Sequence, residues 1–254
     1  MSHVVLPHAK NGRTNGDKLR SLSRVNLRLA PQLAQTMLAG RRSDDTATRF
    51  NAHVQRAGYA FTSDSVSNNI PFITPLLTDF AEKRAGAPIR YLEIGAYEGR
   101  NLAFMSWLLP DQLDVTVIDP WFNADFNPDP EYHAIEFRYR GNMMRTRFRS
   151  QRTLRSTSEV ELPKMLAEGQ RYDLIYVDGS HAALAVMSDM CMSASLLDIG
   201  GMMVLDDYWH DISEISGPGV KQAVDHFLAI FGDFFEVNAV YRQLVVTKTR
   251  AIPR

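Results

Sequence analysis

The chain has 254 residues, of which 45% are hydrophobic and 22% are charged, and its formal net charge is −1. This balance suits one α/β domain with a helical extension and excludes the strongly basic surface of a general nucleic-acid binder. A single cysteine, Cys191, excludes an internal disulfide framework and favours a reducing compartment. No apolar stretch has membrane-spanning length and residues 1–20 have no signal-type apolar core, so we expect a cytoplasmic protein without membrane contacts.

Residues 1–88 are expected to form a polar tail followed by a helical extension. Short helical patterns occur in this part of the chain, and Pro31 interrupts them. Apolar residues then recur on one helical face over residues 70–84, with Asn68 or Asn69 as the N-cap. We expect the extension to cover a functional site or to form the interface of a homo-oligomer.

Residues 89–254 alternate between strand-like and helix-like segments. The expected strands are 89–94, 114–118, 152–155, 172–177, 202–205, 234–240 and 243–247. The expected helices are 100–109, 131–147, 158–168, 182–197 and 218–231. This alternation predicts an α/β fold with a doubly wound parallel sheet. The last two strands have no helix between them, so one strand at the end of the chain should run antiparallel.

Three segments join an apolar run to an acidic end, and they are the most informative part of the sequence. They lie at 91–99, 173–181 and 202–207. A short apolar run that ends in turn residues is typical of a buried parallel strand. Because the carboxyl ends of such strands share one edge of the sheet, these acids should meet where open α/β folds bind ligands.

The first of these segments has the spacing Glu93-x-Gly95-x-x-x-Gly99 between a strand and a helix. It differs from the dinucleotide fingerprint, in which the first position is a glycine and backbone amides surround a pyrophosphate. The two glycines still permit close backbone approach. The acid would repel a phosphate and would suit a cationic ligand such as S-adenosylmethionine; the alternative is an ordinary tight turn.

Asp119 ends the second expected strand, 24 residues after Gly95. An acid at this place hydrogen-bonds ribose hydroxyls in nucleotide-binding α/β folds. The alternative is a surface aspartate before a proline. Together with the glycine turn, Asp119 resembles the class I S-adenosylmethionine-dependent methyltransferases over about residues 89–248. That resemblance implies a Rossmann-like seven-stranded sheet with the last strand antiparallel, and it places Ser158 near the adenine and Asp178 beside the cofactor.

The other two acidic segments carry Asp178 at the end of the fourth strand and Asp206 and Asp207 at the end of the fifth. In a doubly wound sheet these strands are neighbours. Three carboxylates that meet repel one another unless a cation lies among them. Oxygen ligands favour Mg²⁺, Ca²⁺ or Mn²⁺ over zinc. The alternative is that one or two of these acids cap helices or face solvent.

His181 follows Asp178 by three residues, at the start of the next helix. A metal lowers the pKa of a bound hydroxyl, and a neutral imidazole can take the proton, so this pair suits methyl transfer to an alcohol. The alternative is a histidine with a structural hydrogen bond.

The pattern Asp178-Gly-Ser-His181 with Asp206-Asp207 is similar to the metal-dependent sugar and macrolide O-methyltransferases of the macrocin and mycinamicin type. This resemblance implies that Asp178, Asp206 and Asp207 hold Mg²⁺, that His181 is the general base and that Asp178 shares in catalysis. It also implies a small-molecule acceptor, a glycosylated or hydroxylated metabolite of natural product biosynthesis. Catechol-type methyltransferases have lysine at the position of His181 and usually Asp-Asn at the position of Asp206-Asp207, so the chain departs from that pattern twice.

Two alternative functions stay open: a catechol- or phenol-type O-methyltransferase, and a non-catalytic scaffold that binds the cofactor. Two further features have both a functional and a structural interpretation. Tyr208, Trp209 and His210 would line an acceptor pocket or simply pack. The seven arginines within Arg138–Arg155 would bind an anionic acceptor or form a solvated helix face.

Overall fold

A computed structural model describes residues 29–40, 44–121, 130–208 and 219–253. Its helices, in chain order, are α2 (Ala30–Gly40), α3 (Asp44–Ala57), α4 (Ile70–Lys83), α5 (Arg100–Leu108), α6 (Pro130–Met143), α7 (Ser158–Ala167), α8 (Ala183–Leu196) and α9 (Val220–Phe231), followed by the short 3₁₀ helix η2 (Gly232–Phe234). Its strands are β1 (Ile89–Ile94), β2 (Leu113–Ile118), β3 (Ser150–Leu154), β4 (Tyr172–Val177), β5 (Leu197–Leu205), β6 (Phe235–Val240) and β7 (Leu244–Lys248).

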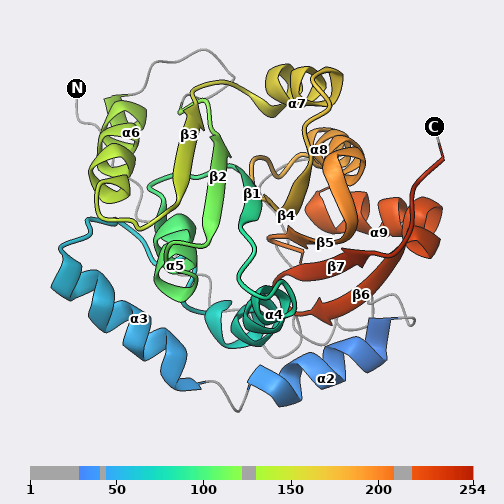
Figure 1. The fold of residues 1–254 in the computed structure, drawn as a ribbon, viewed down its shortest axis with the longest axis horizontal. Coiled ribbons are helices and arrows are strands. Elements are labelled where there is room, and N and C mark those ends of the chain that lie inside the picture. The colour runs from blue at the N-terminus through green and yellow to red at the C-terminus, as the bar shows by residue number, and fades with distance from the viewer. Residues whose placement is uncertain (1–28, 41–43, 122–129, 209–218, 254) are drawn as a thin grey trace, which may run out of the picture.

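The seven strands form one sheet in the order β3-β2-β1-β4-β5-β7-β6 (Figure 1). The first five strands pair in parallel, whereas β7 runs antiparallel to both β5 and β6. The predicted doubly wound, Rossmann-like sheet with an antiparallel last strand is therefore confirmed. β4 and β5 are neighbours, as the placement of the acidic segments required.

Helices cover both faces of the sheet, and each face has its own apolar core. On one face Leu77 of α4 and Phe104 of α5 pack against β1, β2 and β4. On the other face Met190 of α8 and Phe227 of α9 pack against β4, β5 and β7. All six residues of β4 are buried, which explains why this central strand reads as an almost continuous apolar run.

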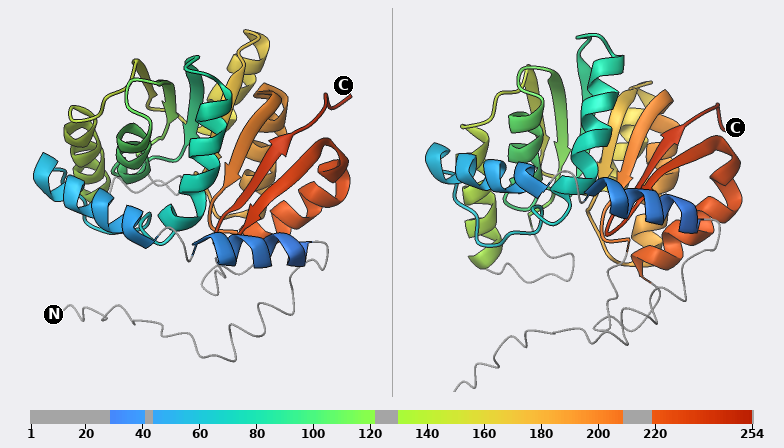
Figure 2. Two further views of the ribbon diagram at one scale, coloured as in Figure 1. Left: turned by 60° about the horizontal axis from the view of Figure 1, so that its bottom comes forward. Right: turned by 90° about the horizontal axis from the view of Figure 1, so that it is seen from below.

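The N-terminal helices α2 and α3 lie along one side of the molecule and both contact α4 (Figure 2). α4 itself is part of the sheet core, since Ile70 and Leu77 are almost fully buried there. Pro31 lies in the first turn of α2 and therefore does not interrupt the helix. N–H groups in the first turn have no hydrogen-bond acceptor within the helix, so the missing N–H of proline costs nothing there. The division into residues 1–88 and 89–254 stays a prediction.

The element bounds agree with expectation to within two residues apart from two cases. β5 begins at Leu197, directly after α8, five residues before the expected start at residue 202. The helix expected to reach residue 147 ends at Met143. Among the described residues, none of the helices is long and apolar enough to cross a membrane.

Candidate functional site at the carboxyl edge of the sheet

The carboxyl ends of three central strands are aligned by backbone hydrogen bonds. The first residue after β1, β4 and β5 donates its N–H to the neighbouring strand over 2.9, 2.8 and 3.0 Å; these residues are Gly95, Asp178 and Asp206. Since the backbone hydrogen bonds between the strands continue one residue beyond each strand, Gly95, Asp178 and Asp206 lie side by side at this edge. The expected convergence of the acidic segments is therefore seen at the level of the backbone.

The two glycines of the first segment are required by backbone geometry. Gly95 has φ +82°, and a Cβ at this position would lie 2.1 Å from the carbonyl oxygen of Asp178. Gly99 has φ +78°, and its Cβ would lie 2.5 Å from the methyl group of Met143. Both conformations favour glycine, and at Gly95 the obstacle is rigid backbone. The glycine loop thus lies directly against the end of β4.

Glu93 lies within β1 and is 1% exposed. Its Oε2 accepts hydrogen bonds from the Tyr91 hydroxyl and, over 3.0 Å, from Asn101 Nδ2. Burial raises the pKa of Glu93 to about 8, although both of these hydrogen bonds lower it. The carboxyl group is therefore satisfied by protein donors under α5. Tyr91 precedes it by two residues on a strand, so period-two alternation could have predicted this pair.

Asp119 is 9% exposed and holds the glycine loop. Its Oδ2 accepts the N–H groups of Ala96 and Tyr97 over 2.7 and 2.9 Å, and its Oδ1 accepts the N–H of Trp121 over 2.7 Å. Burial raises the pKa of Asp119, against the effect of these three bonds. Binding of a ribose by Asp119 stays a prediction. Trp121 is buried against Tyr139, with ring centroids 4.5 Å apart, which indicates that this tryptophan is part of the core.

Ser158 is the first residue of α7 and faces the buried Asp189 of α8. Burial raises the pKa of Asp189 to about 6, and its hydrogen bond with Ser158 lowers it. Asp189 Oδ2 would lie 3.7 Å from a Cβ at Gly179, in the loop after β4. Ser158 is thus close to the end of β4, while its contact with an adenine stays a prediction.

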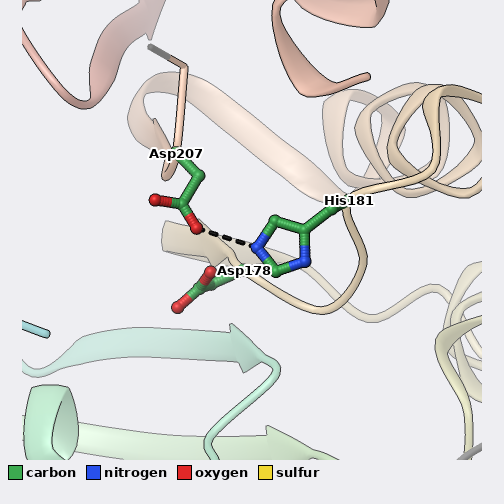
Figure 3. A group of neighbouring side chains, drawn as sticks. All are labelled: Asp178, His181 and Asp207. Atoms are coloured by element: carbon green, nitrogen blue, oxygen red, sulfur yellow. Dashed lines mark hydrogen bonds and ion pairs between the residues drawn. The ribbon is translucent and has the colours of Figure 1, made fainter. Parts of the chain in front are cut away.

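Asp178, His181 and Asp207 form a group in which one potential ligand atom of each lies within 4.8 Å of the others (Figure 3). Asp178 follows β4 and Asp207 follows β5, so neighbouring parallel strands bring the two carboxylates together. His181 Nε2 lies 2.9 Å from Asp207 Oδ2, which orients the imidazole toward the acids. Asp207 has φ +52°, an uncommon conformation for a residue other than glycine.

The charge in this group is unbalanced. Burial raises the pKa of Asp178 well above its usual value, and the nearby carboxylates of Asp206, Asp207 and Glu93 raise it further. The hydrogen bond to Asp207 raises the pKa of His181, against the effect of burial. Within the described part of the chain, no side-chain hydrogen bond to the Asp178 carboxylate is seen. A divalent cation with oxygen ligands would relieve this repulsion.

Asp206 lies in a different environment from the other two aspartates. Its Oδ2 accepts hydrogen bonds from the Tyr176 hydroxyl and, over 3.2 Å, from Gln243 Nε2. Its Oδ1 accepts the N–H of Asp207 over 2.7 Å and Nδ2 of Asn69 over 3.4 Å. The structure therefore brings Asp178 and Asp207 together with His181, whereas Asp206 is held by protein donors.

The network of donors around Asp206 could be predicted from the sequence only in part. Tyr176 shares a strand face with Asp178, which alternation could have revealed. Gln243 and Asn69 come from β7 and from the residue before α4, and their meeting with Asp206 depends on long-range packing.

The remaining candidates are accounted for by structural contacts. Tyr208 is fully buried and its hydroxyl donates to Asp225 over 2.8 Å, so it packs in the core; Trp209 and His210 lie outside the described residues. Most of the arginines in Arg138–Arg155 have acidic partners in the structure, and the pairs are Arg138–Glu98, Arg140–Glu136, Arg147–Asp111, Arg149–Asp114 and Arg155–Glu136. These pairs favour a solvated, internally neutralised surface over an anion-binding face.

Comparison with known proteins agrees with this geometry. Residues 92–208 match the model of a family described as a methyltransferase domain. A search of curated protein sequences finds no match. The chain resembles the class I S-adenosylmethionine-dependent methyltransferases in its sheet order and in its matched segment.

Three solved structures illustrate the likeness in fold. A cofactor-bound protein of Mycobacterium tuberculosis (MTB), Rv0187, has a TM-score of 0.53 at 16% identity and covers 94% of this chain and 99% of its own. A Klebsiella pneumoniae protein described as an inferred O-methyltransferase has a TM-score of 0.52 at 18% identity. The match covers 81% of this chain and 90% of that protein. The O-methyltransferase from Bacillus cereus in complex with SAH has a TM-score of 0.51 at 16% identity. The match covers 87% of this chain and 100% of that protein. At these identities the likeness shows the fold alone.

Proposed function

We propose that this protein is an S-adenosylmethionine-dependent O-methyltransferase that uses a divalent cation, with Mg²⁺ as the first candidate, to methylate a hydroxyl of a sugar or secondary metabolite. The match of residues 92–208 to a methyltransferase domain supports the methyl-transfer part. The observation that carries the rest is the close approach of Gly95 to Asp178, which sets the glycine loop against the acid that faces His181 and Asp207. A cofactor bound at the glycine loop and a cation bound by Asp178 and Asp207 would therefore lie next to each other.

The proposed cofactor site uses the glycine loop and the strand ends on either side of it. Its residues are Glu93, Gly95, Gly99, Asp119, Ser158 and Asp178. The glycines leave room for close approach to the backbone. The surplus of acids at this edge suits a ligand that carries an ammonium and a sulfonium, as S-adenosylmethionine does.

The donor set fits an oxygen-liganded cation. Asp178 and Asp207 are the carboxylates that face each other across β4 and β5, and burial together with the charges of Asp206 and Asp207 raises the pKa of Asp178. We propose both as ligands. Asp206 stays the third proposed ligand; protein donors already hold it, so it would bind the cation through the remaining acceptor capacity of its carboxylate oxygens.

We assign His181 the role of general base. When bound, the cation lowers the pKa of an acceptor hydroxyl and the cofactor supplies the methyl group. Asp207 fixes the orientation of the imidazole through the 2.9 Å contact at Nε2. Because Asp207 raises the pKa of His181 above 6.5, the neutral base becomes abundant only above that pH, and activity should rise with pH through this range.

The test is a comparison of acceptors with wild type and His181→Ala. Formation of S-adenosylhomocysteine would be measured with Mg²⁺ and two acceptor sets, glycosides and catechols. On an aliphatic hydroxyl we expect His181→Ala to lose ~10²-fold or more, because the base must take a tightly held proton. A catechol-type enzyme would prefer the phenols and would lose little. A cofactor-binding scaffold would show cofactor binding and no turnover with either set.

A further inference from the structure

Asn69 occupies the N-cap position of α4 but does not cap the helix. Its side chain makes no capping hydrogen bond, although asparagine at this position usually does so. Instead, Nδ2 of Asn69 donates to Asp206 Oδ1 over 3.4 Å. The first residue before α4 thus reaches the row of acids at the carboxyl edge of the sheet.

The orientation of the Asn69 amide follows from Asp206. Both oxygens of the Asp206 carboxylate accept other hydrogen bonds, from Tyr176 and from the N–H of Asp207. An ionised carboxylate is an acceptor only, so the NH₂ group of Asn69 must face it and the carbonyl oxygen must point elsewhere.

That carbonyl oxygen is buried and has no hydrogen-bond partner among the described residues. Asn69 is 4% exposed. Its Oδ1 is one of few buried side-chain nitrogen or oxygen atoms in the described chain that have no hydrogen-bond partner. Buried acceptors are normally satisfied, because a lost partner costs free energy. The main chain of Asn69 is held in place, since its main-chain carbonyl oxygen accepts the N–H groups of Phe72 and Ile73.

The electrostatic setting indicates which donor is missing. Asp178, Asp206 and Asp207 are three carboxylates that follow the neighbouring strands β4 and β5 at this edge. A donor that carries positive charge, or that is bound to a cation, would satisfy Asn69 and the acids together.

We propose that Asn69 is a ligand-binding residue of this site. Its Nδ2 holds Asp206, and its Oδ1 accepts a hydrogen bond from a cationic or cation-bound donor, either the α-ammonium of S-adenosylmethionine or a water on the divalent cation. This inference rests on the proposed function, and it joins α4 and the extension before it directly to ligand binding.

The experiment is isothermal titration of wild type, Asn69→Ala and Asn69→Ser. Serine keeps a good helix-start residue but is too short to reach Asp206, so it guards against misfolding. Three probes are used: S-adenosylhomocysteine without cation, 5′-methylthioadenosine, which lacks the amino-acid part, and Mg²⁺ alone. Asn51→Ala is the matched control, because Asn51 is an amide of α3 whose bonds go to Ser67 and Arg100 and not to the acids.

If the donor is the ammonium, both Asn69 variants should bind S-adenosylhomocysteine at least ~10-fold more weakly and 5′-methylthioadenosine unchanged, as expected for a hydrogen bond to a charged group. If the donor is a cation-bound water, the Mg²⁺ affinity should fall ~10-fold instead. The inference is overturned if all three affinities stay within ~2-fold of wild type, or if Asn51→Ala has the same effect. Failure of wild type to bind the nucleoside at all would overturn the proposed function itself.

Discussion

The two halves of the strand-end edge differ in how their acids are satisfied. Around β1 and β2, Glu93 and Asp119 are buried and accept hydrogen bonds from two and three protein donors. Around β4 and β5, Asp178 and Asp207 face each other and His181 across a group with surplus negative charge. The carboxyl groups of the first half already have protein donors, whereas those of the second half would gain stability from an added cation.

Asp206 shows that position in the sequence does not decide this difference. It is adjacent to Asp207 and follows the same strand, yet it has the hydrogen-bond environment of the first half. The two residues differ in backbone conformation, since Asp207 has a φ of +52°, and in their partners. Four predictions test the comparison.

The largest effect is expected for Asp178→Asn. Loss of one proposed ligand removes several kcal/mol of transition-state stabilisation, so cation-dependent methyl transfer should fall ~10³-fold. The same change removes a repelled charge, so the cation-free protein should melt at the same temperature as wild type or higher. Turnover assays and thermal melting measured together decide the matter. A variant that loses turnover and also melts lower would show that Asp178 is a structural residue.

Gly95→Ala should destabilise the fold by ~3 kcal/mol or more. The new Cβ meets the Asp178 carbonyl oxygen at 2.1 Å, and φ is +82°. Gly99→Ala is the matched control with similar φ, where the obstacle is the flexible methyl group of Met143, and it should cost less. Urea unfolding compares the two variants. Equal losses would mean that the contact between the loop and β4 is not rigid.

Asp206→Ala and Asp207→Ala should differ in their effect on stability. Removal of Asp206 leaves the Tyr176 hydroxyl without its acceptor, while Gln243 keeps its bond to Tyr176, and should cost ~2 kcal/mol of unfolding free energy. Removal of Asp207 should change stability by less than ~1 kcal/mol and abolish the cation response. Chemical denaturation with and without Mg²⁺ measures both quantities. Similar stability losses in the two variants would erase the proposed difference between them.

Glu93→Gln should change the pH dependence of stability. The folded-state pKa of about 8 lies above the ordinary 4.5, so between these values the folded state holds one proton more than the unfolded state. Stability from this group is therefore present at low pH and lost as pH rises, by ~1.4 kcal/mol per pH unit. Denaturation at several pH values in that window, without ligands, should show a shallower slope for the variant. Parallel slopes would contradict the buried, protonated carboxyl group.

The sheet could be predicted from the sequence because its strands are short apolar runs separated by helical periodicity. β1 and β4 have the expected bounds, and the antiparallel pair at the end of the chain followed from the missing helix. β5 was predicted too short at its start, where pairing of Leu197 with Tyr172 of β4 keeps the chain in the strand. Tertiary pairing outweighed local propensity there.

The candidate site could be predicted only in part. The meeting of Asp178 and Asp207 followed from strand adjacency, and His181 from its spacing. The burial of Asp206 could not be foreseen, because its partners Gln243 and Asn69 lie 37 and 137 residues away in the chain. Sequence spacing indicates which strand an acid follows, but the donors that reach it depend on packing.

The central claim is that the acids after β4 and β5 hold a cation and that the acids near β1 and β2 do not. The most direct test is calorimetric titration of Mg²⁺ into wild type, Asp178→Asn and Asp119→Asn, each in the presence of S-adenosylmethionine. We predict a binding heat for Mg²⁺ in wild type and Asp119→Asn and none in Asp178→Asn. An unchanged Mg²⁺ heat in Asp178→Asn, or no heat in any of the three, would contradict the account.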